Sequence, residues 1–382
     1  MRYRKIKRCK DLAVSEIALG CEGFLGKSEE EYLQMIDCAQ KLGINFIDMY
    51  TPNPQFQKYL GEALAGRRKA FVLQGHLCSV WENEEYLRTR NLEKVKRAFE
   101  DQLKHLQTDY LDIGMIHYVD AMDDWKEVAE NGILEYCQNL KEEGRIHAIG
   151  MSSHNPEVAA EAVRTGAVDV LMFSVNAAYD MQPSNEDVDE LFKRENYREG
   201  MGIHPERAAL YELCEREGVA IDVMKAFGGG DMLKEELSPF GVAFTEAQCI
   251  EYCLTRPAVV AVMAGCHSVS EIEKAAAYLN ASTEEKDYAT VLGKMEKFQF
   301  QGNCMYCGHC APCSVGISVA DVNKYLNLCL AQKMVPETVA DHYRLLPHHA
   351  SECIACGKCE KNCPFGVEII EKMKKAAEVF GY

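Results

Sequence analysis

The sequence predicts an α/β protein in which a (β/α)8 barrel comes first and a smaller, mainly helical domain follows. Two observations support this prediction. From residue 16 to about residue 280, short apolar runs rich in β-branched residues alternate with longer helical patterns, as in parallel βαβ units. Near the C-terminus this alternation stops, and cysteines gather in two short runs. We place the boundary so that residues 1–290 form the barrel and residues 291–382 form the second domain.

The first part contains eight segments with the composition of buried strands, the number that closes a TIM barrel. In chain order these predicted strands are Glu16–Gly20, Ile44–Asp48, Ala70–Gln74, Leu111–His117, Ile146–Met151, Val168–Ser174, Val219–Lys225 and Val259–Gly265.

Helical patterns lie between these strands, and three of them begin with a recognisable cap. Ser28 with Glu31, and Thr245 with Gln248, have the capping-box spacing, and Asn155 precedes a proline at the first helical position. The predicted helices include Ser28–Leu42, Asn91–Leu106, Trp125–Glu143, Asn155–Thr165, Pro205–Glu217 and Thr245–Thr255.

The longest segment that fits neither a strand nor a helix is Tyr179–Ile203. It is either a lid or docking loop after the sixth strand or a plain solvated insertion. In the second domain we expect a charged helix at Glu284–Phe300, a helical region at Val319–Leu330 and an amphipathic C-terminal segment at Val367–Phe380.

Acidic residues outnumber basic ones by 59 to 42, which gives a net charge of −17. Such a surface repels nucleic acid and anionic lipid and favours a partner with a positive docking patch. No apolar run approaches the roughly 20 residues that span a bilayer, and the basic start Met1–Lys10 is not followed by the apolar region of a signal peptide. We therefore expect a cytoplasmic protein that binds neither nucleic acid nor membrane. Nothing in the composition indicates an oligomeric state.

The two cysteine runs point to iron. The second run reads Cys-x2-Cys-x2-Cys-x3-Cys-Pro, the spacing with which bacterial ferredoxins bind [4Fe–4S] clusters. Zinc is the main alternative, but zinc sites separate two Cys-x2-Cys pairs by a long gap rather than placing three thiols in series. We therefore predict two [4Fe–4S] clusters in a ferredoxin-like domain that transfers electrons. Their ligands are Cys304, Cys307, Cys310, Cys313, Cys353, Cys356, Cys359 and Cys363.

In two-cluster ferredoxins the fourth cysteine of each run binds the other cluster. This rule pairs Cys363 with the first three cysteines of the first run, and Cys313 with the first three of the second run. The first run departs from the pattern, because Cys313 follows Cys310 after two residues and its proline precedes it. The ligand set is therefore better determined than the pairing.

In a (β/α)8 barrel the reactive groups lie where the strands end at the C-terminal face. An acid, histidines, a lysine and a tyrosine converging there are the groups of a proton-transfer site. The residues at the predicted strand ends include Asp48, Tyr50, His76, His117, Ser152, Asn176, Lys225 and Gly265.

From Arg2 to about Leu279 the chain resembles the aldo-keto reductase family, and specifically its members with a C-terminal ferredoxin module. The motifs that carry the resemblance are Gly43–Asp48, Leu60–Leu64, Thr108–His117, Gly144–Ser153 and Phe227–Gly230. The resemblance implies a barrel that transfers hydride between a nicotinamide and a carbonyl by means of an Asp, Tyr, Lys and His tetrad.

Half of this tetrad is replaced here. Asp48 and His117 stand at the family positions, but the tyrosine falls on Asn53 and the lysine on Gly75, next to His76. Asparagine cannot act as a general acid. We therefore expect His76 to move the proton, with Tyr50 and Lys225 as alternatives.

If a nicotinamide such as NADH or NADPH binds, the resemblance places Ser152, Asn176, Lys225 and Gly265 along its path. A flavin would couple hydride transfer to one-electron clusters, but no Gly-x-Gly-x-x-Gly fingerprint opens a βα turn. We expect an iron–sulfur oxidoreductase that binds a small carbonyl or polar substrate and exchanges electrons with a ferredoxin or flavoprotein. The alternative is a non-catalytic electron-transfer or docking protein with a degenerate reductase barrel.

Overall fold

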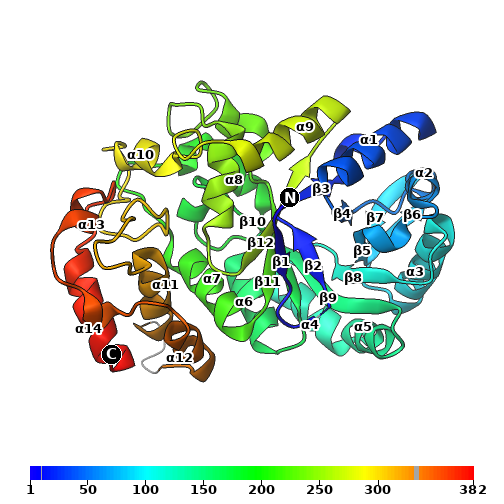
Figure 1. The fold of residues 1–382 in the computed structure, drawn as a ribbon. Coiled ribbons are helices and arrows are strands. Elements are labelled where there is room, and N and C mark those ends of the chain that lie inside the picture. The colour runs from blue at the N-terminus through cyan, green and yellow to red at the C-terminus, as the bar shows by residue number, and fades with distance from the viewer. Residues whose placement is uncertain (10, 331–334) are drawn as a thin grey trace.

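A closed barrel of parallel strands forms the first part of the molecule (Figure 1). The computed structural model describes residues 1–9, 11–330 and 335–382, so Lys10, the end of the basic start, lies outside the described residues. The predicted (β/α)8 fold is confirmed. Around the barrel the strands are β3 (Ile17–Gly20), β4 (Phe46–Met49), β5 (Val72–Leu77), β8 (Leu111–Ile116), β9 (Ile146–Ser153), β10 (Val170–Ser174), β11 (Ala220–Met224) and β12 (Val259–Gly265).

Two strand boundaries differ from the prediction in a way that matters for the site. β5 begins at Val72 and continues to Leu77, so His76 lies within the strand rather than on the loop after it. β9 runs on to Ser153, which places Ser152 in the strand as well. The side chains of these residues are therefore held by the barrel wall.

The helices that surround the barrel begin where the caps predict. The Ser28–Glu31 and Thr245–Gln248 capping boxes are both present, and Asn155 caps its helix. The predicted helix 125–143 is instead two helices, because Gly132 adopts a left-handed φ of 82° between them. These helices are α1 (Glu29–Leu42), α2 (Pro54–Leu64), α3 (Leu92–Leu106), α4 (Met122–Glu130), α5 (Ile133–Glu142), α6 (Pro156–Arg164), α7 (Pro205–Glu217), α8 (Glu246–Leu254) and α9 (Val269–Ala277).

Two antiparallel hairpins, neither of them predicted, are added to the barrel. The first joins β1 (Tyr3–Lys5) to β2 (Ala13–Ser15), and Leu12 and Val14 pack in the same apolar cluster as the barrel interior. The second joins β6 (Ser79–Glu82) to β7 (Glu85–Arg88) directly after β5.

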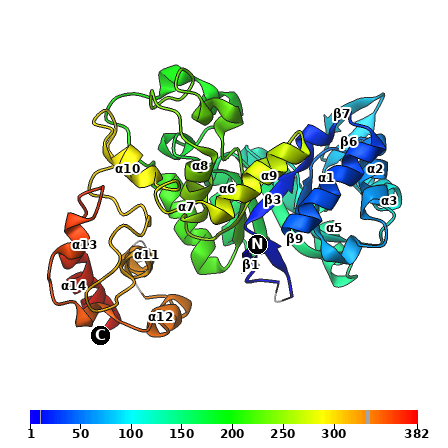
Figure 2. The ribbon, with the colours of Figure 1, turned by 45° about the horizontal axis from the view of Figure 1, so that its top comes forward.

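The C-terminal region is helical, as predicted, and lies beside the α7 and α8 side of the barrel (Figures 1 and 2). The predicted helix 284–300 is shorter, because only α10 (Tyr288–Gly293) forms and Gly293 approaches Pro364 too closely for a side chain. The other helices of this region are α11 (Val319–Leu330), α12 (Glu337–Arg344), α13 (Lys358–Lys361) and α14 (Ile369–Phe380).

The long segment after β10 links the barrel to this C-terminal region. Residues 179–203 contain three short 3-10 turns. The amide of Gly200 donates to the Lys297 carbonyl, and the amide of Gln299 donates to the Met201 carbonyl, each over 2.7 Å. Within the described residues, no helix is long and apolar enough to cross a membrane.

Candidate functional site

Four side chains form a hydrogen-bonded series at the C-terminal end of the barrel, which we call the mouth relay. Asp48 Oδ1 lies 2.9 Å from His76 Nε2, and His76 Nδ1 lies 2.6 Å from His117 Nδ1. His117 Nε2 in turn lies 2.5 Å from the Tyr86 hydroxyl. The relay runs from a carboxylate of β4, through β5 and the end of β8, to a hydroxyl of the β6–β7 hairpin.

Hydrogen-bond logic fixes the direction of each bond in the relay. Because Asp48 accepts from His76 Nε2–H, the neutral His76 ring presents Nδ1 as an acceptor. His117 must then donate from Nδ1–H, which leaves its Nε2 free to accept from the Tyr86 O–H. Every proton in the series is therefore directed toward Asp48.

The electrostatic environment keeps this series neutral at its outer end. Burial lowers the pKa of His117 well below its ordinary value, and the nearby His76, Arg90 and Arg88 lower it further. Burial raises the pKa of Tyr86, against the opposing effect of Arg88 and Arg90. His117 is thus held as a neutral acceptor beside a protonated phenol.

The Tyr86 side chain also reaches solvent, since 40% of the residue is exposed. The inner histidine, by contrast, is 4% exposed. A molecule at the mouth can therefore contact the relay at Tyr86 without displacing His76.

Two further buried side chains support the inner end of the relay. The Gln74 amide donates to Asp48 Oδ1 over 2.9 Å and to Asp222 Oδ2 over 2.8 Å. Burial raises the pKa of Asp222 well above its ordinary range, and the nearby Asp48 raises it further. Burial and the neighbouring carboxylate therefore disfavour the ionised form of Asp222, against the opposing effect of the Gln74 hydrogen bond.

A cavity of about 180 Å³ lies beside the same strand, between the second hairpin and helices α2 and α3. His76 and Trp81 line it together with the basic side chains of Lys94 and Arg97. The inner histidine thus faces both the relay and a small polar hollow.

In the C-terminal region, the eight clustered cysteines divide between two hollows. Apolar side chains such as Phe365 and Ile369 complete the first hollow, and Ile317 and Met373 complete the second. The first is lined by Cys304, Cys307, Cys310 and Cys363, and the second by Cys313, Cys353, Cys356 and Cys359.

This division has the crossed arrangement that the ferredoxin rule predicts. Within the described ranges, no three His, Cys, Asp or Glu side chains converge as they would around one metal ion. Thiols spread around a hollow suit the larger [4Fe–4S] cube better than a single zinc ion. The soft donor set and apolar surroundings therefore fit such a cluster.

Comparison with known proteins gives the family. The aldo/keto reductase family matches residues 16–248, and the 4Fe-4S binding domain matches residues 346–368. This chain belongs to the aldo/keto reductase family. The oxidoreductase YqkF of Bacillus subtilis is 26% identical over 299 residues, which cover 75% of this chain and 94% of YqkF.

Two other comparisons agree with this assignment. The aldo-keto reductase YhdN of Bacillus subtilis is 29% identical over 144 residues, covering 37% of this chain and 42% of YhdN. The structure of aldo-keto reductase AKR11C1 from Bacillus halodurans, in its holo form, superposes with a TM-score of 0.59 at 24% identity and covers 75% of this chain and 94% of that one. That likeness supports the fold, and the protein is an aldo-keto reductase-like oxidoreductase with a 4Fe-4S binding domain.

The structure places the two residues that the resemblance puts at the tyrosine and lysine positions of the family tetrad. Asn53, at the expected tyrosine position, caps α2 by accepting from the Phe56 amide over 3.0 Å. A Cβ on Gly75, at the expected lysine position, would lie 2.6 Å from a Leu111 methyl, so this position faces away from the mouth. The next residue, His76, faces Asp48 instead.

Two of the residues expected along a nicotinamide path are engaged with the backbone. The Ser152 hydroxyl accepts from the Tyr118 amide over 2.7 Å. The Asn176 side chain accepts from the Ala178 amide and donates to the Lys225 carbonyl, each over 2.9 Å. Asn176 and Lys225 are thus joined, Ser152 lies apart from them in β9, and Gly265 is the exposed last residue of β12.

Tyr50 lies half-buried near the relay, where burial and the nearby Glu22 and Tyr86 raise its pKa. Sequence reasoning missed Tyr86, Gln74 and Asp222. The turn before Tyr86 is Asn83-Glu84, where both residues adopt positive φ as a tight hairpin requires, and Asn83 is its one residue of a type that such turns favour. The two interior polar residues carry no comparable signal.

Proposed function

We propose that this protein is an iron–sulfur oxidoreductase that interconverts a small carbonyl-bearing substrate and its alcohol at the barrel mouth. Electrons are exchanged through two [4Fe–4S] clusters in the C-terminal domain, which we place at residues 291–382. The observation that carries the proposal is the mouth relay, because it connects a buried carboxylate–imidazole pair to an accessible hydroxyl. Membership of a reductase family supports the same class of reaction.

The relay residues have separate roles in this proposal. Tyr86 gives its proton to the substrate oxygen during reduction, and takes one from the alcohol during oxidation. His117 passes that proton between Tyr86 and His76. Asp48 stabilises the imidazolium that forms when His76 holds the proton, as a carboxylate does beside a charged imidazole. Tyr86 therefore takes the part that the sequence alone assigns to His76 or Tyr50.

The clusters account for the electrons of the reaction. Conversion of a carbonyl to an alcohol takes up two electrons and two protons: the relay would supply the proton on oxygen, solvent water the proton on carbon, and each bound [4Fe–4S] cluster one electron. Two clusters together would therefore hold the two electrons that one turnover requires. The cysteines that line the first and second hollows would hold them, and a ferredoxin or flavoprotein would exchange electrons with them.

A nicotinamide is the other source of an electron pair in this family. Its path in this proposal passes Ser152, Asn176, Lys225 and Gly265. The engagement of Ser152 and Asn176 with the backbone favours electron supply through the clusters as the main route.

The test uses the anaerobically purified full-length protein. Iron and acid-labile sulfide should approach about eight of each per chain, the content of two [4Fe–4S] clusters. The clusters are then reduced with a ferredoxin-type donor, with NADH or with NADPH, and their visible absorbance is followed as small aldehydes and ketones are added. We expect reoxidation by a carbonyl with formation of the matching alcohol.

If the clusters are reduced and yet no carbonyl or other small polar acceptor reoxidises them, the proposal is wrong. The barrel would then serve as the docking scaffold of an electron-transfer protein. Reduction by NADH or NADPH alone would show that a nicotinamide binds and feeds the clusters.

A further inference from the structure

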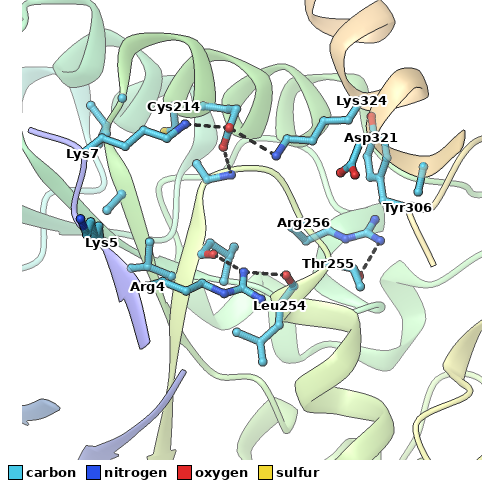
Figure 3. A pocket seen from close by; sticks show the side chains of 18 residues that line it. Arg4, Lys5, Lys7, Cys214, Leu254, Thr255, Arg256, Tyr306, Asp321 and Lys324 are labelled. Atoms are coloured by element: carbon cyan, nitrogen blue, oxygen red, sulfur yellow. Dashed lines mark hydrogen bonds and ion pairs between the residues drawn. The ribbon is translucent and has the colours of Figure 1, made fainter. Parts of the chain in front are cut away.

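Arg256 is a buried cation where the barrel meets the C-terminal domain (Figure 3). It follows α8, is 6% exposed, and lines a cleft of about 390 Å³ together with Tyr306 and Lys324. Its guanidinium donates to the Thr255 hydroxyl over 3.2 Å and to the Tyr288 hydroxyl over 3.1 Å. The position is therefore rigid and shielded from water.

The guanidinium also contacts the loop between two of the clustered cysteines. It donates to the carbonyl of Met305, which lies between Cys304 and Cys307, and it stands 4.0 Å from the Met305 sulfur. The guanidinium carbon lies 5.7 Å from the centre of the Tyr306 ring. Arg256 thus faces the loop that provides the first thiolates of the first hollow.

The charge of Arg256 has no carboxylate partner of its own. Among the described residues, no carboxylate forms an ion pair with it. Arg256 Nε donates to the Tyr252 backbone carbonyl over 3.2 Å, and the hydroxyl of the same tyrosine donates to the buried carboxylate of Asp180 over 2.6 Å. Asp180 already pairs with the fully buried Arg207 at 3.9 Å, so two buried arginines share one buried carboxylate.

Three of the four other cations that line the same cleft are paired, and the fourth, Lys5, is exposed to solvent. Lys7 and Lys324 both contact Glu215, at 2.8 and 3.3 Å, and Arg4 contacts Glu16 at 2.8 Å. A buried charge without a partner is strongly unfavourable in a folded protein. Asp321 lines the same cleft, and the thiolate set of the first hollow is a further source of negative charge beside Arg256, since a cluster on four thiolates is an anion.

We propose that Arg256 is the counter-charge of the cluster bound by Cys304, Cys307, Cys310 and Cys363 and raises the reduction potential of that cluster. Arg256 is a positioning residue for electron transfer, and this role rests on the two clusters of the proposed function. A fixed positive charge stabilises the reduced form more than the oxidised form, because reduction adds one negative charge.

The test is a redox titration of the full-length protein followed by EPR. Arg256→Gln keeps a hydrogen-bond donor near the Met305 carbonyl but removes the charge. We expect the equilibrium constant for reduction of the first cluster to fall at least tenfold, which lowers its reduction potential by about 59 mV for a one-electron couple. The second cluster should not change. The couples are assigned with Cys356→Ser, which removes a ligand of the second hollow.

Two controls separate charge from architecture. Tyr288→Phe removes another hydrogen bond to the Met305 carbonyl, 2.8 Å long, without changing any charge, and should leave both potentials unchanged. Lys324→Gln removes a cation that is already paired with Glu215 and should have little effect. Arg256→Lys keeps the charge at a greater distance and should give a smaller shift in the same direction.

This inference is overturned if the first cluster has the same reduction potential in wild type and in Arg256→Gln. It is also overturned if Tyr288→Phe shifts that potential as much as Arg256→Gln does. If Arg256→Gln does not retain the first cluster, Arg256→Lys is compared with wild type instead. An unchanged reduction potential of the first cluster in Arg256→Lys also overturns this inference. A wild-type protein without any cluster signal would instead refute the proposed function.

Discussion

The sharpest test of the mouth relay is Tyr86→Phe, which removes one hydroxyl and keeps the ring. That hydroxyl is 2.5 Å from His117 Nε2. Because Tyr86 is 40% exposed and its hydroxyl makes a single hydrogen bond within the described part of the chain, the folded state should lose no more than about 1 kcal/mol. The change in activity should be far larger than the change in stability.

The size of the expected loss of activity in Tyr86→Phe follows from the proposed role of Tyr86 as a general acid. Positioned proton transfer contributes about 10²–10⁴ in rate, or about 3–5 kcal/mol of transition-state free energy. We expect the rate of carbonyl-dependent cluster reoxidation to fall by that factor in single-turnover stopped-flow measurements. The apparent substrate affinity should change only a few-fold, since the ring still fills its place.

Tyr50→Phe is the matched control, because Tyr50 is a second half-buried phenol of the mouth whose pKa is also raised by burial. It should retain activity within a few-fold. If Tyr50→Phe loses activity and Tyr86→Phe does not, the proton comes from Tyr50 and the assignment of Tyr86 is refuted. If both variants keep full activity, the relay has no part in the rate-limiting proton transfer.

Three other outcomes are expected. Because the pKa of His117 is lower in the folded than in the unfolded protein, its stabilising contribution is present above about pH 6.5 and is lost as the pH falls. The unfolding temperatures of wild type and His117→Gln should therefore differ less at pH 5.5 than at pH 8. The contribution of Asp222 to stability depends on pH in the opposite way, because its raised pKa makes ionisation a cost that grows as the pH rises above about 3.9. Asp222→Asn should therefore raise the unfolding temperature more at pH 8 than at pH 5. In the crossed arrangement, the double variant Cys304→Ala/Cys363→Ala should lose one cluster and keep about four iron atoms per chain. Uncrossed pairing would instead damage both clusters, and iron analysis with EPR distinguishes the two arrangements.

The barrel could be predicted because its signals are local. Each strand is a short apolar run, and capping residues such as Ser28 and Thr245 mark helix starts by hydrogen bonds that reach only three residues along the chain. Helix breaks were harder to predict. A left-handed Gly132 divides one expected helix, and contact between Gly293 and the distant Pro364 accompanies the early end of another.

One member of the mouth relay, Tyr86, was missed for a different reason, whereas Asp48, His76 and His117 were predicted as site residues. The hairpin strand that carries Tyr86 is exposed along its whole length, so it has no alternation of apolar and polar residues. Its turn uses Asn83 and Glu84 without the glycine that usually marks such turns. His76 was identified as a candidate, but its bond to His117 depends on the register of β5 with β8, which pairs His76 with Met115.

The replacements of the family tetrad are better explained as a rearranged proton path than as a loss of catalysis. Asn53 caps α2, so the site gives up a tyrosine there, while the hairpin after β5 brings the Tyr86 hydroxyl to His117. Burial of His117 against His76, with their Nδ1 atoms 2.6 Å apart, depresses the pKa of His117 and so costs folding free energy as the pH falls below about 6.5. A scaffold used only for docking gains nothing from that arrangement, whereas a proton-transfer site requires it. The ordered carboxylate, imidazole pair and accessible phenol therefore argue for an active barrel supplied with electrons by the C-terminal domain.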